Sequence, residues 1–293
     1  MITIIFPPGG FGSTIEHCIR QFSLELPKSN TVVNDDGSMH SYAEGVNKKE
    51  FHPIYLNDLE LLKTNSYQIA TPVYPGLEHS LPITAVLKIK DMIRNLGPTI
   101  IVCLDTIKIA ERNELFLYHK LQSSDIYLNV VLKDKAKSWN PNYECYTDMQ
   151  QYELREALSF HIDYLTNCVD VRSVVEPDWL CITPDDILYN FEHTIIKIMD
   201  HCELTQDTTR DINEFYQLWY QKQQYIIEEF DLINDIVQSV NEDSITWPGL
   251  SILGEAIVQA RLRTQGLDMA CYMVNDFPDN TIDLKKILIP KEK

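Results

Sequence analysis

The apolar positions of the chain follow two patterns, which are short continuous runs and helical periodicity. The apolar runs at 2–6, 99–104 and 179–182 are rich in β-branched residues, and each is followed by apolar positions at helical spacing. Short continuous apolar runs are typical of strands buried on both faces of a parallel sheet. A shorter strand is expected at 67–71, before Pro72.

Helical periodicity is clearest after these strands and in the last third of the chain. Helices are expected over 83–96, 106–121 and 183–202. Strands that alternate with helices predict an α/β fold, a parallel sheet with helices on both faces, over residues 1–204. Residues 205–293 are predicted to form a helical C-terminal region packed on this core.

The turn PPGGFGST at 7–14 has two interpretations. Its three glycines free the backbone to bend, and the N–H groups that begin a helix attract anions, so the turn can hold a phosphate. Alternatively the turn is structural, with Ser13 as the helix N-cap and Glu16 completing a capping box. A carboxylate in that place would repel a phosphate, so the two interpretations exclude each other.

A second helix start is predicted after the strand at 179–182. Thr183 is the expected N-cap, Pro184 suits the first helical position, and Asp185 and Asp186 favour the positive end of the helix dipole. Capping thus accounts for this acid pair without a metal. No HExxH or CxxC spacing occurs, and no metal site is expected.

The chain is acidic, with 43 acidic and 25 basic residues and a net charge of −18. This balance opposes nucleic-acid binding, which depends on Lys and Arg to neutralise phosphates. No apolar run reaches the length of a membrane span, no basic signal-peptide start is present, and seven cysteines without a CxxC pair indicate reduced thiols. We therefore expect a soluble cytoplasmic protein whose partners include neither nucleic acid nor a membrane.

The order of these parts resembles the sulfotransferase branch of the P-loop fold. In that family a first strand leads into a loop of small and hydroxyl residues that binds the 5′-phosphosulfate of the donor PAPS. IIFPPGGFGSTIEHCI at 4–19 looks like this unit, IIVCLDTIKIAERNEL at 100–115 looks like the later strand and turn for the 3′-phosphate, and WLCITPDDILYNFEHTIIKIMDHCEL at 179–204 looks like the late strand–helix unit. The resemblance spans about residues 1–205.

The resemblance implies a protein that binds PAPS, PAP or another adenine nucleotide and passes a sulfuryl group to a small hydroxyl acceptor. The family's basic residues are absent from their usual places, and Lys108 and Arg112, one turn apart on a helix, are the candidate replacements. The candidate cofactor-binding residues are Gly9, Gly10, Gly12, Ser13, Thr14, Lys108 and Arg112.

Transfer to a hydroxyl also needs a base. His79, in PGLEHSLP, is the candidate by position, because loops at the carboxyl ends of strands line the cleft of such sheets. His17, one turn into the first helix, is the next candidate, and a structural role is the alternative for both. Further candidate cations near the turn are Arg20, Arg261 and Arg263.

Two other functions remain open. One is a non-catalytic interaction or structural protein with the same fold and a protein partner, which the missing basic residues and the acidity favour. The other is a nucleotide or sugar kinase-like phosphotransferase, which lacks support because Gly12 stands where a Walker A loop has its Lys. The acidic cluster Glu228, Glu229 and Asp231 is interpreted as a solvated helix face.

Overall fold

The computed structural model describes ten stretches of the chain, which divide between two compact units. The described residues are 2–6, 10–28, 33, 69–70, 97–121, 175–239, 245–246, 249–269, 281–282 and 288–290. The first unit is Met1–Asn113 with Asn167–Gln223, and the second is Glu114–Thr166 with Gln224–Lys293. The predicted helix at 83–96, Gly9 and His79 lie outside the described residues.

A four-stranded parallel sheet forms the centre of the first unit. Its strands are β1 (Ile2–Ile5), β2 (Ile69–Ala70), β3 (Thr99–Val102) and β4 (Leu180–Ile182), in the order β2-β1-β3-β4. Every neighbouring pair is parallel, and the register places Ile5 opposite Ile101 and Val102 opposite Ile182. The three strands expected from the apolar runs are therefore neighbours in one sheet, which confirms the prediction of a parallel α/β fold.

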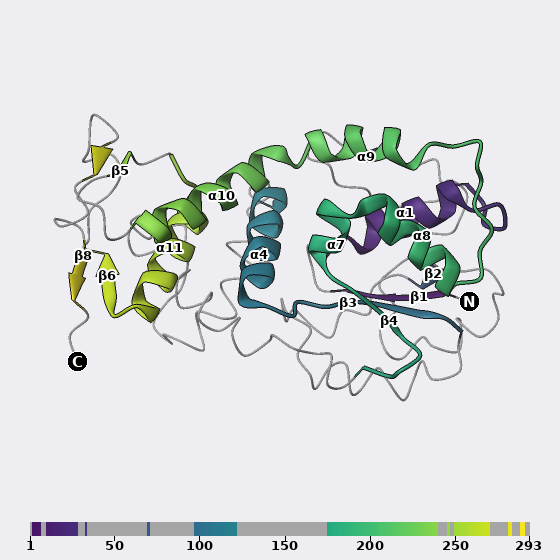
Figure 1. Ribbon diagram of the computed structural model, residues 1–293, viewed down its shortest axis with the longest axis horizontal. Coiled ribbons are helices and arrows are strands. Elements are labelled where there is room, and N and C mark those ends of the chain that lie inside the picture. The colour runs from purple at the N-terminus through teal and green to yellow at the C-terminus, as the bar shows by residue number, and fades with distance from the viewer. Residues whose placement is uncertain are drawn as a thin grey trace. The chain divides into compact units, whose positions relative to one another are not determined.

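Both faces of the central strands are covered. All four residues of β1 and all four of β3 are buried, and successive side chains of a strand point to opposite faces. Among the described helices, α1 (Gly12–Phe22), α7 (Pro184–Tyr189) and α8 (Phe191–His201) lie on the same side of the sheet (Figure 1). That helices cover the other face as well stays a prediction.

The core of the first unit forms where α1, α8 and α9 (Ile212–Gln221) pack in sequence. Ile15 and Ile19 of α1 and Ile195 and Ile198 of α8 are fully buried, at the helical spacing that predicted them. Trp219 of α9 is also fully buried. Its aromatic neighbours are Phe11, Phe191 and Tyr216.

The start of α7 follows the prediction in detail. The Thr183 hydroxyl accepts a hydrogen bond from the N–H of Asp186 (3.2 Å), and the Asp186 carboxylate accepts one from the N–H of Thr183 (2.7 Å). Pro184 occupies the first helical position. This reciprocal capping box satisfies two backbone donors and explains why the helix begins directly after β4.

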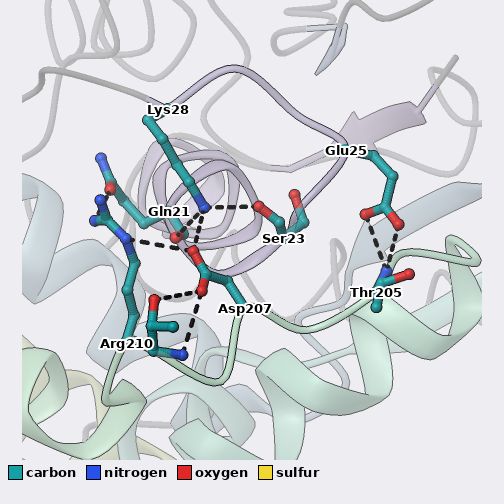
Figure 2. A network of polar contacts seen from close by, with 8 residues as sticks. Gln21, Ser23, Glu25, Lys28, Thr205, Asp207 and Arg210 are labelled. Atoms are coloured by element: carbon teal, nitrogen blue, oxygen red, sulfur yellow. Dashed lines mark hydrogen bonds and ion pairs between the residues drawn. The ribbon is translucent and has the colours of Figure 1, made fainter.

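A polar cluster, which we call the α1 clip, joins the end of α1 to the segment between α8 and α9 (Figure 2). The Lys28 ammonium donates to the carbonyl oxygens of Gln21 (3.0 Å) and Ser23 (2.7 Å). It also donates to Oδ2 of Asp207 (2.8 Å), whose own N–H donates to the carbonyl of Phe22 (2.7 Å). Because the last carbonyls of a helix have no partner within it, the clip satisfies the end of α1. The residues of the clip are Gln21, Ser23, Glu25, Lys28, Thr205, Asp207 and Arg210.

The clip should make stability depend on pH in the acid range. Hydrogen bonds from Lys28 and then from Thr209 lower the pKa of Asp207 from 3.8 to about 2. Since the folded-state pKa is the lower one, the stabilisation is complete above the unfolded-state pKa and is lost as the pH falls toward 2. Thermal unfolding of the wild type and Asp207→Asn should therefore give a difference in Tm that is largest near neutral pH and closes toward pH 2.

The control for this measurement is Asp200→Asn, which removes an exposed carboxylate from α8 of the same unit. Its effect on Tm is compared with that of Asp207→Asn at each pH. A difference between the wild type and Asp207→Asn that persists unchanged at the acid end would contradict the assignment of the shifted group.

The second unit contains α10 (Gln224–Gln238) and α11 (Ile252–Thr264), which pack on each other, and the last turns of α4 (Ile107–Leu121). Two short antiparallel pairs follow, in a region predicted to be mostly helical. These are β5 (Ile245–Thr246) with β7 (Thr281–Ile282), and β6 (Leu267–Met269) with β8 (Leu288–Pro290). Strands of two or three residues are too short to show a period in the sequence.

The division into units does not coincide with the boundary predicted at residues 204 and 205. Residues 205–223 belong to the first unit, because α9 packs on α8 and the α1 clip ties the preceding segment to α1. Residues 114–166 belong to the second unit. The division falls within α4, between Asn113 and Glu114.

Candidate functional site

The candidate site lies at the carboxyl edge of the sheet in the first unit. Because β1, β3 and β4 are parallel neighbours, the residues that follow them meet at this edge. They are the turn 10–14, the start of α4 and the start of α7. Ligands of open parallel α/β sheets bind outside the carboxyl ends of the strands. The topology therefore places the turn at the same sheet edge as the starts of α4 and α7, which carry Lys108, Arg112 and Asp185.

The turn after β1 starts its helix earlier than predicted. The N-cap of α1 is Phe11, in the left-handed region (φ 60°, ψ 15°), and its carbonyl accepts the N–H of Ile15 (2.9 Å). Ser13 is thus already helical, and no side chain caps the helix. The predicted capping box is wrong. Glu16 instead accepts a hydrogen bond from Nε of Arg20 (3.3 Å), one turn further along α1.

The start of α1 consequently keeps the electrostatic character of a bare helix N-terminus. The N–H groups of Gly12, Ser13 and Thr14 have no partner within the helix, and no acidic residue lies in the first turn. The partial positive charge of the helix dipole at this end is therefore not offset by a neighbouring carboxylate of the same turn.

Most of the turn is nevertheless covered by the protein. Gly10, Phe11, Gly12 and Thr14 are buried, and only Ser13 is half-buried. A Cβ at Gly12 would lie 1.9 Å from the ring of Phe6, so packing alone requires glycine there. Any side chain at Gly12 would disturb the fold before it disturbed a ligand. Among residues 10–14, the part of the turn that a ligand can reach is Ser13.

Phe11 holds an unusual conformation for an aromatic residue. A positive φ is rare outside glycine and is retained only where the surroundings impose it. The ring of Phe11 is buried and meets the ring of Trp219 edge-on, with centroids 5.4 Å apart. The aromatic core thus fixes the residue that orients the start of α1.

The two candidate cations of α4 lie in different environments. Lys108 is exposed. Arg112 is buried and forms an ion pair with Asp185 of α7. Its Nη1 donates to the hydroxyl of Tyr189 (3.0 Å), and its guanidinium lies over the Tyr189 ring, 5.2 Å from the centroid. Arg112 therefore links the segments that follow β3 and β4.

The candidate base His17 has a packing role in this structure. Its side chain is buried and stacks on Phe215, with ring centroids 5.3 Å apart. Burial, and then the positive charge of Arg210, lower the pKa of His17 from 6.5 to about 4. The imidazole is therefore neutral at pH 7, and it is a weak base there.

The remaining candidate cations have other described partners or belong to the second unit. Arg20 is buried in its pair with Glu16. Arg261 belongs to the second unit, where it donates to Oδ1 of Asn234 (2.7 Å) and lies over the ring of Phe230. Arg263 is in the same helix.

The second unit contains a buried pair that was not predicted from the sequence. Glu229 of α10 was interpreted as part of a solvated face, but it is only 9% exposed. Its Oε2 lies 2.5 Å from Nε2 of His119, and its Oε1 accepts the N–H of Ser251 (2.6 Å). A signal was present: Glu229 follows Ile226 by three residues and so belongs to the apolar stripe of α10.

Further site types find no support in the described stretches. No group of three His, Cys, Asp or Glu side chains there could hold a metal ion. None of the helices in those stretches has the length and apolar content that a membrane crossing requires. The four cysteines within the described residues are free thiols, namely Cys18, Cys103, Cys181 and Cys202. Comparison with known proteins found no matching family model, curated protein or solved structure.

Proposed function

We propose that the chain is a sulfotransferase-like α/β protein that binds PAPS, PAP or another adenine nucleotide at the carboxyl edge of its sheet. The observation that carries this proposal is the start of α1, which follows β1 directly, has no side-chain cap and has no acidic residue in its first turn. Helix N-termini of this kind bind phosphates through their N–H groups and dipole. The free thiols of the described cysteines agree with a cytoplasmic location.

The residues that a ligand can reach at this point are potential partners for a phosphate. The reachable part of the turn is Ser13, whose hydroxyl and N–H group are both potential donors. Lys108 is exposed at the start of α4, the helix that follows β3, and it supplies positive charge. PAPS, when bound, supplies the sulfuryl group. In this proposal His79 takes the proton of the acceptor hydroxyl, since the low pKa of His17 makes it the poorer base.

The test is a thermal-shift panel of PAPS, PAP, ATP and GTP with the wild type and Ser13→Asp. A ligand at about 100 times its Kd should add about 2.7 kcal/mol of stability. Ser13→Asp places a carboxylate at the start of α1, which favours the helix by about 0.3–1 kcal/mol but repels an anion. We expect the variant to melt at or above the wild-type Tm and to bind the nucleotide roughly tenfold more weakly.

Ser13→Asn is the matched control, because asparagine has nearly the same shape as aspartate but carries no charge. It should bind the nucleotide much as the wild type does. Equal affinity in Ser13→Asp and Ser13→Asn would remove the start of α1 from the binding site. A response to ATP or GTP without a response to PAPS or PAP would favour the kinase-like alternative.

A second candidate function is a non-catalytic protein that binds another protein. It is favoured by two observations: Glu16 and Asp185 balance the charges of Arg20 and Arg112, and most of the turn is buried. This alternative predicts that no nucleotide in the panel changes the Tm. It also predicts no transfer of labelled sulfate from PAPS to any hydroxyl acceptor.

A further inference from the structure

Arg112 is a buried cation whose covering groups are partly open to solvent. Its side chain is 5% exposed, whereas the side chain of its partner Asp185 is 39% exposed. Tyr189, which covers the guanidinium, is 48% exposed. A buried guanidinium requires an anionic or hydrogen-bonding partner at all times. Asp185 and Tyr189 provide that partner from the solvent side, where another anion could approach.

The start of α7 does not need Asp185. Its backbone donors are satisfied by the reciprocal hydrogen bonds of Thr183 and Asp186. Asp185 adds only the general attraction of a carboxylate to the helix dipole. Its specific contact is the ion pair with Arg112, so it can leave that contact without uncapping the helix.

We propose that Asp185 pairs with Arg112 only while no ligand is bound. When the nucleotide binds, one of its phosphates replaces Asp185 on the guanidinium. This inference rests on the proposed function, because it names the residue that competes with the ligand at the same sheet edge. A phosphate monoester competes well with a carboxylate for a guanidinium. It carries more charge than a carboxylate and also accepts two parallel hydrogen bonds from Arg.

The exchange also sets a preference among ligands. Each bound nucleotide must overcome the attraction between Arg112 and Asp185. A terminal phosphate with nearly two charges does so better than a singly charged sulfate ester or carboxylate. The ligand class is therefore a nucleotide with a terminal phosphate monoester. Removing the charge of Asp185 should raise affinity for that class.

The experiment compares the wild type with Asp185→Asn and Asp200→Asn by isothermal titration calorimetry with PAP. Both variants lose one negative charge, but Asp200 is an exposed residue of α8 and is not paired with Arg112 in the described contacts. We expect Asp185→Asn to bind PAP about tenfold more tightly than the wild type, and Asp200→Asn to bind within about twofold of it. Thermal unfolding of each variant without ligand shows that it is folded.

The double variant Arg112→Gln/Asp185→Asn removes both charges of this ion pair. It should lose the gain in affinity that Asp185→Asn shows. If the gain persists in the double variant, or if Asp185→Asn and Asp200→Asn bind PAP equally, the exchange is overturned and the proposed function stands. If the wild type and Asp185→Asn both leave PAP unbound at millimolar concentration, and no other adenine nucleotide changes the Tm, the proposed function itself fails, and the exchange fails with it.

Discussion

Replacing Trp219 with alanine is expected to lower the free energy of unfolding by about 3–5 kcal/mol, the range for a buried large aromatic residue. Trp219 is fully buried and is the largest side chain in the core of the first unit. Its ring contacts Phe11 edge-on and lies 5.6 Å, between centroids, from Phe191. The substitution would leave a cavity between α8 and α9 and remove the contact that accompanies the left-handed backbone of Phe11.

Urea denaturation of the wild type, Trp219→Ala and Leu218→Ala measures this effect. Leu218 is the preceding residue of the same helix and is 60% exposed, so its replacement should change stability by no more than about 0.5 kcal/mol. The contrast tests the packing of α9 in the first unit directly. Similar losses in both variants would show that Trp219 is not the core residue described here.

Replacing Glu229 with alanine should be the other severe change, with a loss of about 3–5 kcal/mol. The reason is that one carboxylate serves two elements of the second unit besides its own helix. It contacts the ring of His119 in α4, and it accepts the N–H of Ser251, the N-cap of α11. Its removal leaves both groups without this partner in a largely buried place. Glu228→Ala, at an exposed position one residue earlier, is the matched control.

The loss at Glu229 should depend on pH in a defined direction. Burial by itself raises the pKa of Glu229, but the hydrogen bonds with His119 and Ser251 outweigh it, and the pKa lies below its ordinary value of 4.5. The ionised carboxylate therefore stabilises the fold above that value, and the stabilisation is lost as the pH falls through the folded-state pKa. The difference between the wild type and Glu229→Gln should shrink in that range; a difference that grows on acidification would contradict this account.

The candidate site shows why local signals were insufficient at its most important turn. Ser13 and Glu16 have the spacing of a capping box, yet the helix begins at Gly12. The cause is not local: Phe11 adopts a positive φ with its ring against Trp219, about two hundred residues later in the chain. Glu16 then pairs with Arg20 instead of reaching the N-cap.

The burial of the charged residues likewise depends on contacts with other elements, whereas their spacing along a helix is local. That Lys108 and Arg112 are one turn apart follows from the helical pattern, but their different burial does not. Arg112 is covered because β4 lies beside β3, which brings Asp185 and Tyr189 over it. Glu229 is likewise buried because α4 and α11 supply partners for it. Such partners are set by the order of strands and the packing of helices, which spacing along one element does not encode.

The order of residues was enough to predict the strands β1, β3 and β4, their parallel arrangement and the helix that Thr183 caps. These features depend on interactions between near neighbours and on the burial of continuous apolar runs, both of which are visible in the order of residues. Three features depend on tertiary packing: where α1 begins, which charges are paired and how residues 205–223 join the first unit. Each of those outcomes depends on contacts between residues far apart in the chain, whose free energies exceed the weak preferences of a single turn.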